Sequence, residues 1–151
     1  EAKPRYEAYR TACQKANPAF FDMLRAEHLT LATDRMVYFA HWITPEERPL
    51  RFDTRFFAAV MPPEQEPVVD GHEIVDLKWL TPAEAIAAST RGDIGLRGPT
   101  IKNLELVAAG GAAASIVVES LGRREVQTIR PRMVQVDGKP LAVLPGDPRW
   151  Y

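Results

Sequence analysis

Residues 41–57, HWITPEERPLRFDTRFF, hold the turn and the strand entrance around which the rest of the sequence is arranged. The Thr44-Pro45 step ends the apolar run before it, because proline removes a donor from a strand ladder. An acidic, proline-containing link follows, and residues 53–61 then predict a strand whose apolar tail is buried on both faces. Charges of both signs lie beside aromatic residues at the entrance of this strand, which indicates a functional site.

The segment before this stretch predicts two helices and a pair of strands. Residues 5–15 carry apolar side chains at helical spacing, and Asn17-Pro18 starts a second helix, since proline suits the first helical position. The short apolar runs 29–33 and 35–43 follow, separated by polar residues, and they predict a strand pair.

The segment after residue 61 begins with a loop rich in proline and acidic residues. Residues 73–80 then predict a strand with Val75, Leu77 and Trp79 on one apolar face. Thr81 and Glu84 form the pattern of a capping box around a proline, so a short helix is expected to run to about residue 88.

The last third of the sequence predicts two more helices and a hairpin. Gly98-Pro99-Thr100 opens a helix that Gly110-Gly111 ends, and residues 112–121 are helical by composition. Asp137-Gly138 joins two apolar runs, which is a strong short-range signal for a β-hairpin. This order of elements indicates an α+β fold or a mixed-sheet α/β fold, rather than regular β-α-β alternation.

Composition limits the classes of partner. The 151 residues fit one domain, which at this size buries roughly 70% of the surface that the unfolded chain exposes. A net charge of −1 lacks the positive surface of a nucleic-acid binder, so no nucleic acid is expected as partner. Cys13 is the single cysteine, which excludes an internal disulfide and a cysteine-based zinc site. No apolar run approaches the roughly 20 residues that span a bilayer, so a soluble chain without a membrane partner is expected.

The strand entrance carries the first candidate binding residues. Arg51, Asp53 and Arg55 alternate along an extended segment and so share one face, while Phe52 and Phe56 lie on the other. Two guanidinium groups around one carboxylate can clamp a phosphate group, because arginine offers a planar fork of donors. The alternative is a ladder of surface ion pairs that contributes little to stability.

Glu73 is the candidate catalytic residue. It lies where the proline-rich loop meets the predicted strand, and a carboxylate there can accept a proton from water or complete a magnesium shell. The alternative is a solvated loop acid. The histidines His28, His41 and His72 are too scattered for a metal site, and His41 is expected to pack beside Trp42 at a strand end.

Several segments, taken in their order, resemble the C-terminal two thirds of a Nudix hydrolase. They are WITP (42–45), RFDTRFF (51–57), DGHEI (70–74), KWLTPAEAI (78–86), the Gly-Pro-Thr helix start (98–100) and IRPRMVQVDGKPLAVLPGD (129–147). The branch that they resemble includes the peroxisomal coenzyme A diphosphatases and their bacterial relatives. The resemblance covers nearly the whole chain, and it rests on the order of the segments more than on any one of them.

The resemblance implies a mixed sheet between helices, incomplete at its N-terminal side, with the polar face of the RFDTR strand bordering the substrate pocket. In this family the glutamates of a Nudix box bind Mg²⁺ or Mn²⁺ and the enzyme cleaves a pyrophosphate bond. The box is absent from the sequence and would precede residue 1, so the 151 residues alone are expected to be inactive. Arg51 and Arg55 would bind phosphate, Asp53 would orient them, and Glu73 would serve the water or the metal.

The implied substrate is a nucleoside diphosphate derivative, with coenzyme A or its acyl form as one candidate. The expected domain, 1–151, consists of a helical insertion (1–27), the sheet and helices (28–122) and a terminal hairpin and tail (123–151). A non-catalytic Nudix-scaffold domain for ligand binding or subunit association is the alternative, and a homodimer is left open. The chain does not end in Ser-Lys-Leu, so a cytoplasmic location is expected.

Overall fold

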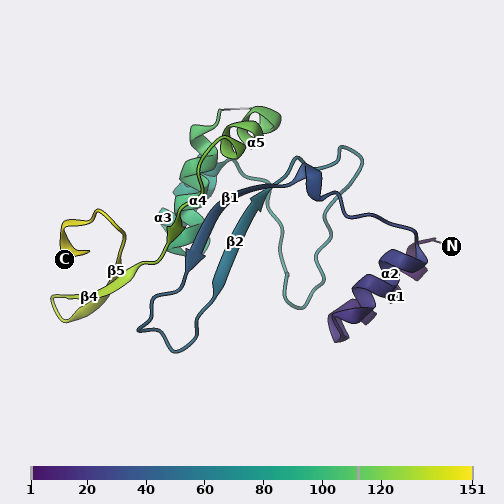
Figure 1. Ribbon diagram of the computed structural model, residues 1–151, viewed down its shortest axis with the longest axis horizontal. Helices are drawn as coiled ribbons and strands as arrows, with labels where there is room; N and C mark the ends of the chain where they lie inside the picture. The colour runs from purple at the N-terminus through teal and green to yellow at the C-terminus, as the bar shows by residue number, and fades with distance from the viewer. Residues whose placement is uncertain (1, 112, 151) are drawn as a thin grey trace. The chain divides into compact units, whose positions relative to one another are not determined.

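The computed structural model describes residues 2–111 and 113–150, and it combines separate helices, a mixed sheet and a hairpin (Figure 1). This combination confirms the α+β class. The chain divides into two compact units, Glu1–Asp34 and Arg35–Tyr151.

The first unit is a pair of helices, α1 (Ala2–Lys15) and α2 (Pro18–Ala26), as predicted. Glu27, directly after α2, connects the end of the pair to its beginning. Its Oε2 accepts hydrogen bonds from Arg5 Nη2 at 3.0 Å and from Tyr6 Oη at 3.1 Å. The side chain of Glu27 is only 11% exposed, so these two donors satisfy an acid that is largely removed from water.

The second unit is built on a three-stranded sheet in the order β2-β1-β3. Strand β1 (Val37–Ile43) pairs antiparallel with β2 (Asp53–Ala58) and parallel with β3 (Thr128–Ile129). A β-bulge between Tyr38 and Ala40 interrupts the first ladder. The mixed sheet therefore has β1 at its centre, where both of its edges are paired.

The core lies where helices cover β1. Phe39, Ala40 and Trp42 form one cluster with Val117 and Leu121. The last two residues belong to α5 (Ala114–Gly122), which packs against the central strand and against α4 (Gly98–Ala109) (Figure 1). Because burial of apolar area dominates folding energetics, this cluster is the main source of stability in the second unit.

Helix α3 (Pro82–Arg91) begins with the predicted capping box. Glu84 N donates to Thr81 Oγ1 at 3.3 Å, and Thr81 N donates to Glu84 Oε2 at 2.7 Å. The hydrogen bonds that the Thr81 backbone N–H and the Thr81 hydroxyl donate to the Glu84 carboxylate lower the pKa of Glu84. The helix ends at Gly92 in the left-handed conformation (φ 84°) and packs its alanine face against α4 (Gly98–Ala109).

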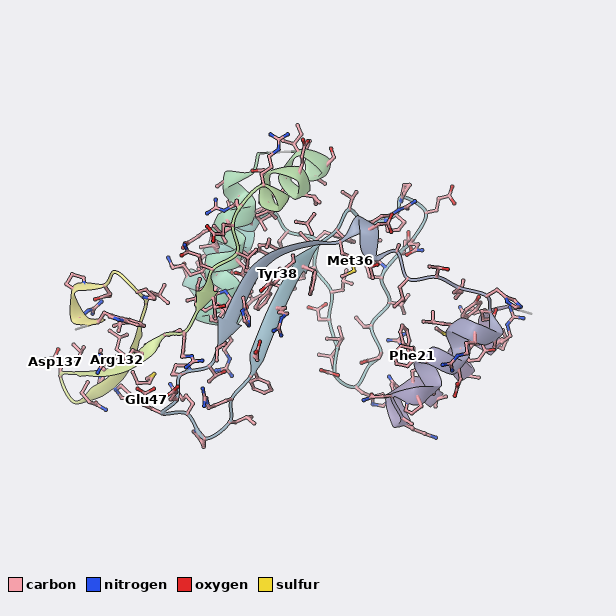
Figure 2. The ribbon with its side chains drawn as sticks, viewed as in Figure 1. Phe21, Met36, Tyr38, Glu47, Arg132 and Asp137 are labelled. Atoms are coloured by element: carbon pink, nitrogen blue, oxygen red, sulfur yellow. The ribbon has the colours of Figure 1, made fainter. Side chains whose placement is uncertain are left out.

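The predicted hairpin is confirmed as β4 (Arg132–Val136) and β5 (Lys139–Val143). Asp137 and Gly138 form the turn, with φ angles of 50° and 73°. Figure 2 shows Asp137 at the tip. Two consecutive positive φ angles are the geometry of a type I′ turn, whose twist matches that of paired strands. Two short 3₁₀ helices, η1 (Thr33–Arg35) and η2 (Pro148–Trp150), complete the described elements.

Two strand predictions were wrong. Residues 29–32 lie in a loop that leads into η1, and residues 73–80 form an unpaired segment with Val75 and Trp79 each 72% exposed. Strand β2 also ends at Ala58, so the tail expected to be buried on both faces is exposed at Val60 (50%) and Met61 (38%). Apolar alternation indicates what a strand would bury, but a strand also needs a neighbour to pair with, and β1 already has two.

Within the described residues, no single helix has the length and apolar character needed to cross a membrane. Only α4 and α5 taken together, as a strongly bent pair, reach that length and composition.

One buried polar contact joins the sheet to the helices. Trp42 Nε1 donates to Asn103 Oδ1 at 3.0 Å, and Asn103, on α4, is 6% exposed. Replacing Asn103 by Ala leaves the indole N–H buried without an acceptor, so we expect a loss of about 1–3 kcal/mol in the free energy of unfolding, measured by urea denaturation. Asn17→Ala is the control, because Asn17 makes no side-chain cap hydrogen bond. Equal stability of the two variants would show that the Trp42 contact is unimportant.

The hairpin turn depends on Gly138. No heavy atom lies within 4 Å of a Cβ built at this position, so Gly138→Ala adds only the strain of a positive φ. We expect it to lower stability by about 1–2 kcal/mol and to speed amide exchange in β4 and β5. Gly95→Ala is the matched control, since Gly95 has equally open space and no positive φ. An equally small effect of both substitutions would contradict the strained-turn account.

Candidate functional site

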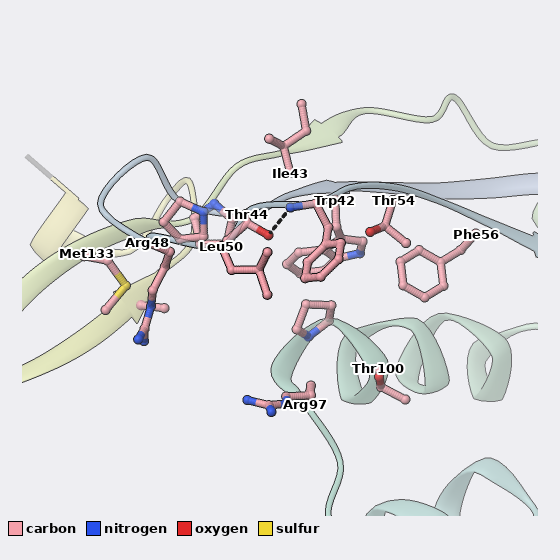
Figure 3. Close-up of a pocket in the computed structure, with 15 residues that line it drawn as sticks. Trp42, Ile43, Thr44, Arg48, Leu50, Thr54, Phe56, Arg97, Thr100 and Met133 are labelled. Atoms are coloured by element: carbon pink, nitrogen blue, oxygen red, sulfur yellow. Dashed lines mark hydrogen bonds between the residues drawn. The ribbon is translucent and has the colours of Figure 1, made fainter. Parts of the chain in front are cut away.

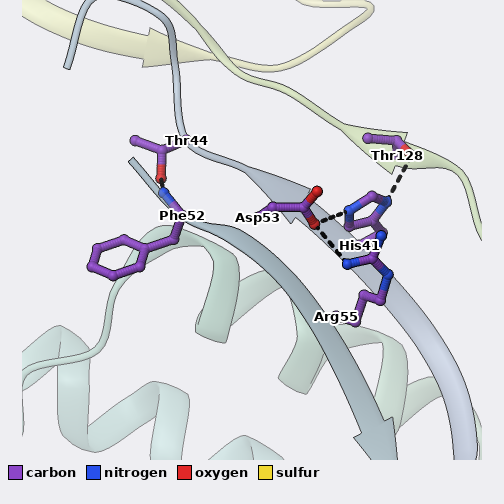
Figure 4. A network of polar contacts seen from close by, with 6 residues as sticks. All are labelled: His41, Thr44, Phe52, Asp53, Arg55 and Thr128. Carbon is purple, nitrogen blue, oxygen red and sulfur yellow. Dashed lines mark hydrogen bonds and ion pairs between the residues drawn. The ribbon is translucent and has the colours of Figure 1, made fainter. Parts of the chain in front are cut away.

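A polar cluster crosses the three strands of the sheet at His41. In the sheet register His41 lies opposite Arg55 of β2 and opposite Thr128 of β3. Its Nε2 lies 2.6 Å from Asp53 Oδ1, and its Nδ1 lies 2.8 Å from Thr128 Oγ1 (Figure 4). The imidazole, 11% exposed, therefore links both neighbours of the central strand.

Asp53 is the shared acceptor of this cluster. Its Oδ1 also accepts a hydrogen bond from Arg55 Nη1 at 3.1 Å. The hydrogen bond from His41 is the main cause that lowers the pKa of Asp53, and the positive charges of Arg55 and Arg130 act in the same direction against partial desolvation. Asp53 is thus held as a carboxylate.

The ionised carboxylate decides the hydrogen-bond directions around His41. A carboxylate only accepts, so Nε2 carries the proton, and in the neutral ring Nδ1 accepts from the Thr128 hydroxyl. A hydroxyl, an imidazole and a carboxylate in this order are the groups that an activated nucleophile requires. However, Thr128, His41 and Asp53 do not line either of the two clefts described below. We therefore interpret their contacts as a structural link between the three strands.

The structure brings together only part of the predicted site. Asp53 and Arg55 form an ion pair on the predicted face. Arg51 precedes β2, and its Nε donates to Thr44 O at 3.4 Å. Glu73 is exposed in a turn whose backbone amides at residues 72 and 74 donate to Asp70 Oδ1. In the described part of the chain, no hydrogen bond or ion pair joins Arg51 or Glu73 to Asp53.

Sequence reasoning missed the roles of His41 and Thr128. His41 was expected to pack beside Trp42; it is buried within β1, and it also makes two hydrogen bonds. An antiparallel pairing of β1 with β2 across the 44–52 link would have placed His41 near residue 55. Thr128 gave no such signal, because β3 joins the sheet from 87 positions away.

A cleft of about 620 Å³ lies against the opposite face of β2 (Figure 3). Arg51, Asp53 and Arg55 do not line this cleft, and the expectation that the polar face of the RFDTR strand borders a substrate pocket stays a prediction. Phe52, Thr54 and Phe56 point to the cleft, because a strand presents alternate residues to opposite faces. Its other lining residues are Trp42, Ile43, Thr44, Pro45, Arg48, Leu50, Arg97, Pro99, Thr100, Pro131, Met133 and Ala142.

A second, smaller cleft of about 330 Å³ contains charges of both signs. Glu46, Glu47, Arg130 and Arg132 line it, and Arg130 Nη1 lies 2.7 Å from Glu46 Oε1. Arg130 is also one of the charges that lower the pKa of Asp53, so its guanidinium acts on both the second cleft and the polar cluster.

Among residues 2–111 and 113–150, no group of three or more His, Cys, Asp or Glu side chains is arranged to hold a metal ion. Comparisons with protein-family models, with curated proteins and with solved structures found no match to this chain. The function is therefore proposed from its residues and their geometry.

The hydrogen bond from His41 gives Asp53 a pH-dependent role in stability. Its pKa in the folded chain lies below the value of about 3.9 for an unfolded chain, so its contribution is present above that value and is lost as pH falls through the folded pKa. We expect Asp53→Asn to lower the melting temperature near neutral pH, and the gap to the wild type to narrow below about pH 4.

Melting temperatures measured across this range check the prediction. In a His41→Gln background the substitution at Asp53 should show a weaker pH dependence, since the main cause of the shift is gone. A gap that stays the same down to the lowest pH at which the chain is folded would contradict the role of His41.

Proposed function

We propose that this chain is the substrate-binding part of a cytoplasmic Nudix-type hydrolase that cleaves the pyrophosphate bond of a nucleoside diphosphate derivative. Coenzyme A or an acyl form of it is one candidate substrate. The Mg²⁺ or Mn²⁺ ligands of that reaction would be the glutamates of a Nudix box outside residues 1–151. When bound, such a metal would activate water and neutralise charge on the diphosphate.

The observation that carries the proposal is the exposed ion pair on β2. Arg55 and Asp53 have side chains that are 55% and 51% exposed, so a ligand can reach the guanidinium. The carboxylate is held in place by His41, which fixes the position of Arg55 without enclosing it. A guanidinium oriented in this way suits bidentate binding of a phosphate group.

The order of elements gives secondary support. The capping-box helix, the helix that opens at Gly98 and the Asp-Gly hairpin form in segments on which the resemblance rests. Arg51 would add a second phosphate contact if a bound ligand replaced its weak bond to Thr44 O. Glu73, exposed in its turn, would accept a proton from the attacking water or complete the metal shell.

A non-catalytic ligand-binding domain on the same scaffold is the second candidate, and the 620 Å³ cleft favours it because its walls can hold a ligand without a metal. The coding sequence upstream of residue 1 separates the two. An intact Nudix box there supports the hydrolase, whereas a box without its glutamates supports the binding domain.

The phosphate clamp can be tested by binding. We expect the chain to bind ADP without hydrolysing it, and Arg51→Ala with Arg55→Ala to weaken this binding about tenfold, since charged hydrogen bonds are lost. Isothermal titration calorimetry measures the affinity. Adenosine is the phosphate-free control ligand, and its binding should be unchanged.

Arg91→Ala is the matched control variant, because Arg91 is also exposed and paired with an aspartate two positions away, at 2.9 Å. It should bind ADP like the wild type. Unchanged affinity in the double variant, with its circular dichroism spectrum intact, would rule out the clamp.

A further inference from the structure

The 620 Å³ cleft has apolar walls and positive charges. Ten of its fifteen lining residues are apolar or proline, and the two charged ones among them are Arg48 and Arg97. Its volume falls within the range of small-molecule sites, roughly 300–1,000 Å³. A site with apolar walls and a few polar groups selects a ligand of the same mixed character.

Large apolar side chains are exposed at the cleft. Leu50 is 69% exposed and Phe52 is 60% exposed, while Trp42 behind them is 5% exposed. Phe52 is held in position by its backbone, since its N–H donates to Thr44 Oγ1 at 3.0 Å and its carbonyl accepts from Thr44 N at 3.0 Å. The wall is therefore oriented, and a ligand with an apolar body would remove it from water.

Within the described part of the chain, neither of the guanidinium groups of Arg48 and Arg97 makes a hydrogen bond or an ion pair. Figure 3 shows both side chains extending to the same side of the cleft, below Leu50 in that view. Among the arginines whose side chains do form a described hydrogen bond, most pair with a carboxylate. Arg55 and Arg130 are examples.

The start of α4 adds to the positive potential. Arg97 occupies the N-cap of this twelve-residue helix and makes no side-chain cap hydrogen bond, so the N–H groups of Gly98 and Thr100 stay available, while Pro99 between them has none. The amide dipoles favour a negative charge at this end. Pro99 and Thr100, in the first turn, line the same cleft.

We propose that this cleft binds a small amphiphilic oxyanion, with its flat or branched apolar body against Phe52, Leu50 and Met133 and its carboxylate or phosphate on Arg48 and Arg97. The site is separate from the proposed phosphate clamp, since it lies on the opposite face of β2 from Asp53 and Arg55, and it gives the second candidate function a class of ligand. Charge complementarity selects an anion, and the apolar wall excludes small inorganic anions as preferred ligands.

Three probes of equal body test the site by isothermal titration calorimetry: naphthoate, naphthyl phosphate and naphthol. At least one of the two anions should bind about tenfold more tightly than uncharged naphthol, and its affinity should fall with added salt. The anion that binds better identifies the charged end of the ligand. If naphthol binds as tightly as both anions, the proposal is overturned.

Substitutions separate the two parts of the site. Arg48→Ala and Arg97→Ala should each weaken anion binding about tenfold and leave naphthol unchanged, whereas Phe52→Ser should weaken all three probes. Arg124→Ala is the control, because Arg124 is exposed and lies outside the cleft lining. Unchanged anion binding in both cleft arginine variants would overturn the proposal.

Failure of this proposal can be distinguished from failure of the proposed function. The variant with Arg51→Ala and Arg55→Ala should bind naphthoate like the wild type, because neither residue lines the cleft. Loss of ADP binding with intact naphthoate binding would support both sites separately.

Discussion

The pairing of β1 on both edges is the constraint on which the second unit depends. Its residues 39–42 are all buried, and an extended segment can be buried only where its backbone groups find partners. Strand β2 supplies partners on one edge and β3 on the other. His41 strengthens both pairings through its side chain, which explains why a polar residue occupies a buried position in an otherwise apolar strand.

The fold was predictable where the signal lies within a few residues. The capping box of Thr81 and Glu84 and the turn at Asp137-Gly138 are local, since each depends on a hydrogen bond or a φ angle set by its own residues. The segments 29–33 and 73–80 have strand-like patterns but no partner strand in the described chain. A pattern of side chains gives the preferred face of a strand, whereas the pairing is decided by the rest of the molecule.

The candidate site, like the fold, was predictable only where the signal lies within a few residues. The period of two in a strand places Asp53 and Arg55 on one face, and the structure pairs them at 3.1 Å. The contacts of Asp53 with His41 and of His41 with Thr128 span 12 and 87 positions, so they depend on sheet register. The cleft depends on α4 and on the hairpin as well, and no single segment of the sequence contains that information.

The two faces of β2 differ in how an anion would have to bind. On the polar face Arg55 already pairs with Asp53, so an incoming oxyanion must compete with a carboxylate that is held ionised by His41. A ligand with several negative charges, such as a diphosphate, competes better than a ligand with one, because its attraction to Arg55 and Arg130 is larger. On the cleft face, no carboxylate among the described residues pairs with Arg48 or Arg97, so a single negative charge is enough and the apolar wall can contribute the remainder of the affinity. The alternation of one strand thus separates a surface suited to highly charged ligands from one suited to amphiphilic ligands.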